Sequence, residues 1–523
     1  MPNVRAKLYE FSVGTLYHRK WTMTLQEWTI SELQSMMTTG ELTSRRLAEL
    51  YLERIDAIDR NGPKVNSVIE TNPDALAIAS SLDDERRRGK TRGPLHGVPI
   101  LIKDNIDTHD RMQTTAGSLA LEGHIASLDA FIVKKLRSEG AVILGKTNLS
   151  EWANFRGKRS VSGWSSRGGL TRNPYALDRS ACGSSSGSGA AVAANLCAVA
   201  VGTETDGSLI CPSQTNGIVG IKPTLGLWSR SGIIPVAHSQ DTAGPMARTV
   251  ADAAILLGAL SGVDEQDSAT RLSKKWALKD YTQFLDENGL KGARIGVARK
   301  MMGTDTRIFK IFEWCLDTMK QKGAVIVDPV DVRNFKKFGR TEMEVLYYEF
   351  KADLNRYLAG TKACVKTVAE VIRFNEENRD RVMPYFGQEH MEIAQGKGSL
   401  RDKKYRGALA KNHRLARKEG IDATMRTYRL DAIVVPSGGP SWTVDLVNGD
   451  AVNWDMDCTR PAAVAGYPHI TVPAGYIFGL PVGISFFAKA WQEPTLIKLA
   501  YALEQATKVR KPPKFLSTAS LDL

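Results

Sequence analysis

The sequence predicts an α/β protein in which a β-sheet packs against helices. Two apolar runs with β-branched members, at 98–102 and 141–144, have the length and composition of buried strands. Residues 130–140 between them have the spacing of a helix, and the small-residue segment 190–202 reads as a buried helix that runs into a further strand. This alternation favours a sheet covered by helices. With 523 residues, 42% of them hydrophobic, the chain has ample material for a large core, as one big domain or two.

The first elements along the chain are predicted to be helices. Thr29-Ile30-Ser31-Glu32 fits a capping box at the start of a short helix. A longer helix is predicted over 43–59, because apolar residues recur there at helical spacing. We expect both to form an N-terminal appendage without a chemical role, preceded by an extension over 1–28.

The charge and hydropathy of the chain bear on its partners and location. A net charge of +13 and a pI near 9.3 raise nucleic acid or an anionic surface as a partner. The basic runs at 85–92 and 401–418 also contain acids or helix-like apolar spacing, which favours a solvated face. No apolar run reaches membrane-spanning length, and 1–28 lacks the apolar core of a signal peptide. We therefore expect no nucleic acid and no membrane as partner. The expected location is cytoplasmic, or secreted or periplasmic if a leader was removed.

The cysteines predict neither a zinc site nor a disulfide framework, since none of them forms a C-x-x-C pair. Two of them, Cys182 and Cys211, lie inside Ser/Gly-rich loops, where we expect small-residue packing rather than redox chemistry. The six are Cys182, Cys197, Cys211, Cys315, Cys364 and Cys458.

Two Ser/Gly-rich loops within 183–213 are the strongest indication of a catalytic site. Serine and glycine permit unusual backbone angles and close approach, so such loops bring backbone N–H groups towards a ligand. Lys103 closes the strand predicted at 98–102. A lysine desolvated there has a lowered pKa and can act as a base near neutral pH. Taken alone, a lysine extending from a strand end to solvent is the simpler interpretation.

Known catalytic templates narrow the chemistry. Neither loop supplies the lysine of a phosphate-binding loop, and no S-x-x-K occurs in the chain. Gly183–Gly187 satisfies G-x-S-x-G with Ser185 as nucleophile, but that motif must directly follow a strand, and 178–182 does not read as one. Serine–lysine chemistry without a histidine remains.

The region 95–251 resembles the amidase signature family. The family's G-G-S-S-G-G-S appears as CGSSSGS at 182–188, and its D-T-G-G-S-I-R-x-P-A appears as ETDGSLICPS at 204–213. Three supporting motifs are TTAGS at 114–118, GKTN at 145–148 and DTAGPMAR at 241–248.

The resemblance implies a catalytic triad and an oxyanion hole. Ser208 takes the place of the nucleophile, Ser184 that of the bridging serine on a cis peptide, and Lys103 that of the base. The implied oxyanion donors are the backbone N–H groups of Thr205, Asp206, Gly207 and Ser208. The implied mechanism passes through an acyl-enzyme and needs no metal and no organic cofactor.

Further stretches resemble the bacterial peptide amidases of that family, which hydrolyse the C-terminal carboxamide of peptides to acid and ammonia. They include WANFRG at 152–157 and AAVAGYPHITVPAG at 462–475. A peptide or small-molecule amide is therefore the expected substrate, with Ser185, Asn154 and Phe155 as substrate-binding residues. We expect a monomer or a weak homo-oligomer.

The resemblance also implies a single amidase-signature domain over 29–510, with helices around a mixed central sheet. Its expected parts are the core signature at 93–260, a variable helical section at about 265–430 and a return to the sheet at 431–510. A C-terminal tail follows at 511–523.

Departures from the family pattern leave alternatives open. Ile210 stands where much of the family has arginine, and Asp206 stands where it has glycine. In the glutamine-using transamidosome subunits that arginine belongs to the substrate-binding neighbourhood, so its absence argues against a glutamine-dependent transamidosome subunit. Other amides, carbamates or esters remain possible substrates, and the basic surface keeps a non-catalytic nucleic-acid-binding protein as a further alternative.

Overall fold

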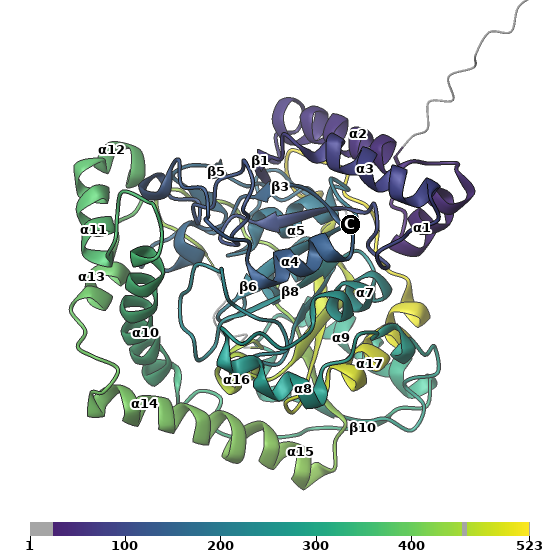
Figure 1. The fold of residues 1–523 in the computed structure, drawn as a ribbon. Coiled ribbons are helices and arrows are strands. Elements are labelled where there is room, and N and C mark those ends of the chain that lie inside the picture. The colour runs from purple at the N-terminus through teal and green to yellow at the C-terminus, as the bar shows by residue number, and fades with distance from the viewer. Residues whose placement is uncertain (1–24, 452–457, 522–523) are drawn as a thin grey trace, which may run out of the picture.

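A long mixed β-sheet runs through the centre of the protein (Figure 1). The structure is a computed structural model and describes residues 25–451 and 458–521; most of the predicted extension at 1–28 lies outside these residues. Eleven described strands form the sheet. In sheet order they are β1 (Val68–Thr71), β3 (Val142–Thr147), β2 (Pro99–Lys103), β6 (Val199–Glu204), β8 (Thr242–Ala247), β7 (Val219–Lys222), β12 (His469–Ile477), β13 (Leu480–Phe487), β11 (Ala432–Pro436), β9 (Arg294–Val297) and β10 (Val325–Val327). A separate hairpin joins β4 (Trp164–Ser165) and β5 (Gly169–Leu170).

The centre of the sheet combines parallel and antiparallel pairs. β2 runs parallel to both β3 and β6, whereas β8 runs antiparallel to β6. Every residue of β2, β3 and β6 is buried, as expected for continuous apolar strands covered by helices on both faces. The predicted α/β class, a single domain with a mixed sheet surrounded by helices, is confirmed.

Most helices pack against this sheet and contribute to its main hydrophobic core. They are α1 (Ile30–Thr39), α2 (Ser44–Arg54), α3 (Ala75–Arg87), α4 (Phe131–Ser138), α5 (Ser186–Ala193), α6 (Ile210–Thr215), α7 (Val250–Leu260), α9 (Thr306–Gln321), α16 (Arg460–Ala465) and α17 (Glu493–Thr507). The short helix α8 (Ser273–Trp276) contributes no residue to that core. Within the described residues, no helix is both long and apolar enough to cross a membrane.

The two predicted N-terminal helices form, and they belong to the main core. Thr29 caps α1 in the expected capping box, accepting from the Glu32 N–H while the Glu32 carboxylate accepts from the Thr29 N–H. Leu33 of α1 and Leu47 and Tyr51 of α2 are fully buried in the same cluster as the sheet residues. The apolar faces of both helices therefore pack into the main core, within the predicted domain at 29–510.

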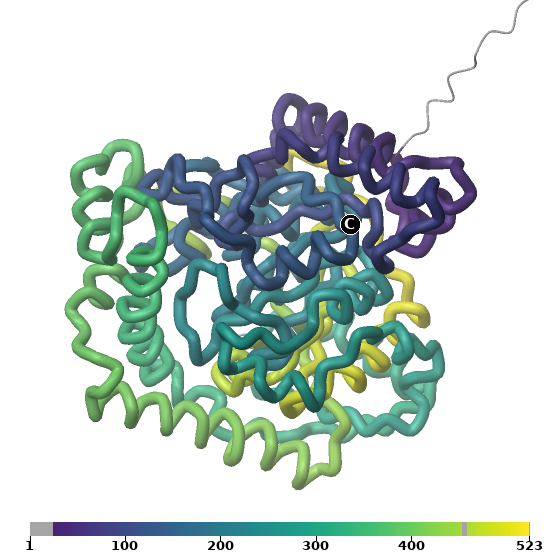
Figure 2. Tube along the Cα trace, viewed as in Figure 1, coloured from purple at the N-terminus to yellow at the C-terminus, as the bar shows by residue number. Residues whose placement is uncertain are grey.

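The section at 265–430 carries a second group of helices. They curve around the left and lower margin of the molecule in Figures 1 and 2. They are α10 (Gly339–Ala359), α11 (Val368–Glu377), α12 (Arg379–Val382), α13 (Glu389–Gln395), α14 (Lys403–His413) and α15 (Asp422–Tyr428). The same section also contributes β9 and β10 to one end of the sheet. Their runs RIGV and VIV are too short to show a clear periodicity, so the sequence did not predict these two strands. The chain then returns to the sheet through β11.

Candidate active site

Three segments meet where β2 and β6 end. Lys103 is the last residue of β2, the Gly183–Ser185 loop leads into α5, and residues 205–209 connect β6 to α6. Because β2 and β6 are parallel neighbours, their carboxyl ends lie at the same edge of the sheet, where open α/β sheets bind ligands.

The ammonium group of Lys103 lies in a cluster of hydroxyl groups. Its Nζ lies 2.7 Å from the Ser184 Oγ, 3.1 Å from the Ser185 Oγ and 2.9 Å from the Thr203 Oγ1. The Thr203 carbonyl oxygen is 3.3 Å away. Among the described residues, no carboxylate is hydrogen-bonded to Lys103, so this lysine is solvated by neutral partners.

Burial changes the acidity of Lys103. The side chain has no exposed surface, and desolvation lowers the pKa of Lys103 to about 7, while the negative charges of Asp241 and Glu204 oppose that shift. Near neutral pH a large fraction of this lysine is therefore the neutral amine, which can accept a proton from a neighbouring hydroxyl.

The loop that carries Ser184 approaches its surroundings closely. The Gly183–Ser184 peptide bond is cis, as the family resemblance implied. A Cβ atom on Gly183 would lie 2.1 Å from the Ser150 Oγ, so a larger residue there would displace the Ser150 side chain. The Ser184 carbonyl accepts a hydrogen bond of 3.1 Å from the Ser150 N–H, which holds the serine at the end of β2.

The turn that carries Ser208 is held from both sides. The Glu204 carboxylate accepts the N–H groups of Leu209 and Ile210 at 2.7 and 3.1 Å, and the Ser208 carbonyl accepts the Ser185 N–H at 3.2 Å. Gly207 has φ +82°, a conformation that favours glycine.

The same turn offers hydrogen-bond donors. Within the described residues, no acceptor binds the backbone N–H groups of Asp206, Gly207 or Ser208. Ser208 is 8% exposed, so a small ligand has access to its hydroxyl. The turn can therefore stabilise an oxygen that gains negative charge.

The prediction about the cysteines is wrong at one pair. Cys182 and Cys211 form a disulfide, with their Cα atoms 6.0 Å apart. Cys182 lies two residues before Ser184, and Cys211 lies three residues after Ser208, in the first turn of α6, so the bond links the Ser184 loop to the helix that follows the Ser208 turn. The 29-residue separation and the lack of a C-x-x-C pair concealed this pairing, because only the folded loops bring the two sulfur atoms together.

The three predicted substrate-binding residues are not brought together in one contact group. The Ser185 hydroxyl is bonded to Lys103 and donates to the Thr203 carbonyl at 2.9 Å. The Phe155 ring stacks on His390 at 5.3 Å and packs against Phe350 of α10. Residues 152–154 have φ values of 53°, 55° and 69°. The Asn154 Oδ1 is buried without a partner among the described residues.

The residue that the sequence reading missed is Thr203. Its hydroxyl accepts hydrogen bonds from both Lys103 and Asn105, the latter at 3.1 Å. A polar residue near the end of an apolar strand, on the strand beside that of Lys103, was the available signal for it.

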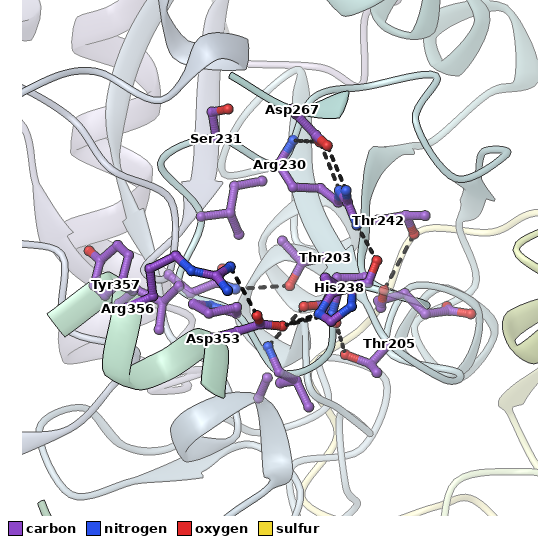
Figure 3. A pocket seen from close by; sticks show the side chains of 18 of the residues that line it. Thr203, Thr205, Arg230, Ser231, His238, Thr242, Asp267, Asp353, Arg356 and Tyr357 are labelled. Carbon is purple, nitrogen blue, oxygen red and sulfur yellow. Dashed lines mark hydrogen bonds and ion pairs between the residues drawn. The ribbon is translucent and has the colours of Figure 1, made fainter. Parts of the chain in front are cut away.

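A cavity of about 270 Å³ lies next to this cluster, and Thr203 and Thr205 form part of its wall (Figure 3). Its charged side chains are largely paired with one another. Arg230 faces Asp267 at 2.6 Å, and Asp353 lies between His238 and Arg356 at 2.6 and 3.2 Å.

Among the described residues, His238, Glu349 and Asp353 form the one group of side chains with the spacing of metal ligands. Their polar atoms already form hydrogen bonds with one another and with neighbouring side chains. The His238 Nδ1 is hydrogen-bonded to Asp353, and Glu349 accepts the Tyr405 hydroxyl at 2.7 Å. Burial disfavours the charged form of His238, but the hydrogen bond to Asp353 and the charge of Glu349 outweigh it and raise the pKa of His238. An ion-pair network accounts for the group.

Comparison with known proteins places this chain among amidases. A family model described as amidase matches residues 46–497. The chain is 42% identical over 507 residues to a probable amidase of Arabidopsis thaliana, covering 95% of this chain and 93% of the relative. It is 34% identical over 491 residues to a glutamyl-tRNA(Gln) amidotransferase subunit of Microcystis aeruginosa, covering 92% and 98%.

Solved structures of amidases are also similar to this chain. The native peptide amidase of Stenotrophomonas maltophilia has 50% sequence identity and a TM-score of 0.89 to this chain, covering 93% of this chain and 98% of that one. A complex of the peptide amidase PAM with the competitive inhibitor chymostatin has the same identity and coverage, and a TM-score of 0.90.

Proposed function

Because this chain belongs to the amidase signature family and is an amide-hydrolysing enzyme, we propose that it removes the C-terminal carboxamide of peptides, with Ser208, Ser184 and Lys103 as its catalytic triad. The observation that supports the triad most directly is the 2.7 Å hydrogen bond between the Lys103 Nζ and the Ser184 Oγ, in a site where the lysine pKa falls to about 7. The substrate class rests on the 50% identity to peptide amidase.

The proposed chemistry follows from the properties of an amide. An amide is a poor electrophile with a poor leaving group, so the attacking hydroxyl must lose its proton and the departing nitrogen must gain one. Neutral Lys103 takes the proton of Ser184, which takes that of Ser208 as the Ser208 oxygen attacks the carbonyl carbon. The proton returns through Ser184 to the nitrogen, the C–N bond breaks, and ammonia leaves.

Water completes the cycle. It attacks the acyl-enzyme by the same proton path, releases the acid and restores the Ser208 hydroxyl. In both steps the carbonyl oxygen becomes negative. The backbone N–H groups of the turn 205–208 are the proposed donors for it, and each such donor is worth about 2.7–4 kcal/mol in the transition state.

Mass spectrometry of an amidated peptide tests the substrate. We expect the intact peptide to gain about one mass unit, because one NH₂ group is replaced by OH. Internal cleavage fragments would contradict the carboxamide specificity. A panel of aryl amides, carbamates and esters as controls separates peptide amides from the other substrates of this chemistry.

The nucleophile is tested separately. Ser208→Ala is expected to abolish turnover and to retain the fold, and a fluorophosphonate probe is expected to label Ser208 in the wild type. The matched control is Ser185→Ala, which removes another buried hydroxyl of the same cluster. Labelling of Ser185 would instead support the G-x-S-x-G interpretation.

A glutamine-dependent transamidosome subunit is the second candidate, favoured by the net charge of +13 and by the 34% identity to the amidotransferase relative. Ile210 counts against it, since this apolar side chain is fully buried and offers no cation to the carboxylate of glutamine. Ammonia release from free glutamine, together with co-purification of a second protein chain, would favour that alternative.

A further inference from the structure

Asp241 lies directly opposite the start of the nucleophile turn. It precedes β8, whose first residue Thr242 pairs with Glu204 at the end of β6. This register brings the Asp241 carboxylate to the Thr205 hydroxyl, which donates a hydrogen bond of 2.6 Å to Oδ1. The other oxygen, Oδ2, accepts the backbone N–H groups of Val236 and Ala237 at 2.9 and 2.8 Å. Both oxygens of Asp241 are therefore occupied, and its position is well defined.

Thr205 is held at a second point by the residue next to Asp241. The Gln240 Nε2 donates to the Thr205 carbonyl and to the Glu342 carboxylate, each at 3.2 Å. Glu204 secures the far side of the turn through Leu209 and Ile210. The donors that follow Thr205 are thus fixed between two carboxylates, one at each end.

The charge of Asp241 acts on the same site. Burial raises the pKa of Asp241 to about 6, while its three hydrogen bonds and Arg230 oppose that shift. Because that value lies below 7, most of the Asp241 carboxylate is ionised at neutral pH, and its charge acts on Lys103. This negative charge favours the protonated form of Lys103 and keeps the pKa of Lys103 higher than burial alone would.

We propose that Asp241 is a positioning residue of the catalytic site, which fixes the oxyanion turn through Thr205 and places a negative charge towards Lys103. The proposal rests on the proposed function, since it assigns a role around the same serine and lysine. Asp241 also lines the cavity beside Thr203 and Thr205, so its effect reaches the substrate side of the turn.

The first experiment measures kcat and KM for Asp241→Ala, Thr205→Val and the double variant. Misaligned oxyanion donors weaken transition-state binding only, so we expect kcat to fall about 10-fold to 100-fold with KM within about threefold of wild type. The double variant is expected to be no more than about threefold slower than the slower single variant, because each single change already removes the Thr205–Asp241 hydrogen bond. Additive losses, or an effect on KM alone, would overturn the positioning role.

The second experiment isolates the charge. In Asp241→Asn the amide oxygen can accept the two backbone N–H groups, and its NH₂ can donate to the Thr205 hydroxyl, so the turn stays in place. With the negative charge gone, Lys103 loses its proton more readily. We expect the acidic limb of the kcat/KM profile to move to lower pH by roughly half a unit, with most of kcat retained.

Asp252→Asn is the matched control. Asp252 is a buried carboxylate in α7 that accepts the Ile30 N–H at 2.8 Å, and burial raises its pKa to about 6 as well. It lies outside the described contacts of the catalytic cluster, so its variant is expected to keep the wild-type pH profile. An unmoved limb in Asp241→Asn, or equal shifts in both variants, would overturn the charge role.

The two proposals fail in different ways. If Ser208→Ala retains turnover, the proposed triad is wrong, whatever Asp241 does. If Ser208→Ala is inactive while Thr205→Val and Asp241→Asn both behave as wild type, only the role of Asp241 is wrong. Thr205→Val and Asp241→Asn are close to isosteric with the wild type, so they still test the role of Asp241 if Asp241→Ala does not fold.

Discussion

Lys103 and Lys146 are buried on neighbouring strands, yet they have different surroundings. Both side chains are fully buried, and desolvation lowers the pKa of each. In the parallel pairing of β2 and β3, Lys103 lies opposite Thr147, and Lys146 lies opposite Ile102. Successive side chains of a strand point to opposite faces, so this one-residue offset sends the two lysines to opposite sides of the sheet.

The two faces give the lysines different partners. Lys103 meets the hydroxyl groups of the serine loop, which can pass a proton on. Lys146 donates to the Ile106 carbonyl at 2.7 Å and to the Thr114 hydroxyl at 2.8 Å, and Asp104 and Asp107 oppose the fall in its pKa. Burial of a lysine is therefore not enough to indicate a base; the groups that share its proton decide its role.

Removal of Lys103 is the largest expected effect. Lys103→Ala is expected to lower kcat/KM by about 10²-fold to 10⁴-fold, because the proposed general base is lost. The loss is expected in kcat, measured as ammonia release from a peptide amide, while circular dichroism and the urea midpoint show a retained fold. Activity near that of wild type at neutral pH would reduce Lys103 to a strand-end lysine.

Removal of Lys146 sharpens the contrast. In Lys146→Met the Ile106 carbonyl and the Thr114 hydroxyl lose a buried donor, and Asp104 loses a neighbouring positive charge, so we expect the free energy of unfolding to fall by about 2 kcal/mol. The kcat of the folded fraction is expected to stay within a fewfold of wild type. Urea unfolding followed by tryptophan fluorescence measures the first quantity. A large loss of kcat without destabilisation would break the distinction between the two lysines.

The Cys182–Cys211 disulfide joins the segments that carry Ser184 and Ser208, the serines near Lys103. Cys182→Ala/Cys211→Ala removes a covalent link across 29 residues, and we expect a loss of about 3 kcal/mol in unfolding free energy. We also expect lower kcat, because Ser184 and Ser208 are then held less tightly. Reduction of the wild type by dithiothreitol is expected to give the same change, and the double variant should not respond to the reductant.

The pH profile tests the protonation state of Lys103. Since its pKa lies near 7, the base is charged below that value, and kcat/KM is expected to fall about tenfold per pH unit on the acidic side. Stability carries the same sign. The folded-state pKa lies below the ordinary value of 10.5, so the unfolded chain binds more protons between these values, and the contribution of Lys103 to stability rises with pH across that range. A kcat/KM profile that is flat through pH 7 would contradict the assignment of Lys103 as a neutral base.

The smallest expected effects come from one hydroxyl on each face. Thr203→Val removes a partner of Lys103, and Thr114→Val removes a partner of Lys146. Each is expected to cost about 1 kcal/mol of stability. Only Thr203→Val is expected to change kcat/KM or its pH profile. Equal kinetics in both variants would show that the hydroxyl cluster does not tune the base.

Local signals in the sequence predicted much of the framework. The apolar runs before Lys103 and Thr147 are continuous and rich in β-branched residues, and this pattern predicted the buried strands β2 and β3. The capping box of Thr29 and Glu32 depends on residues three apart and formed as expected. The motifs carrying Ser184 and Ser208 identified the family, because their spacing is itself a property of the chain.

The amino-acid sequence by itself determined the strands, the caps and the two serine loops, since each depends on neighbouring residues. The family resemblance implied Lys103 as the base, but only the tertiary structure showed how this lysine meets those loops, which cysteines pair, and that Thr203 and Asp241 adjoin the site. The physical reason is that these contacts join residues far apart in the chain: Lys103 is 81 positions from Ser184 and 100 from Thr203. Such contacts depend on strand register, and a shift of one residue would turn Lys103 to the opposite face.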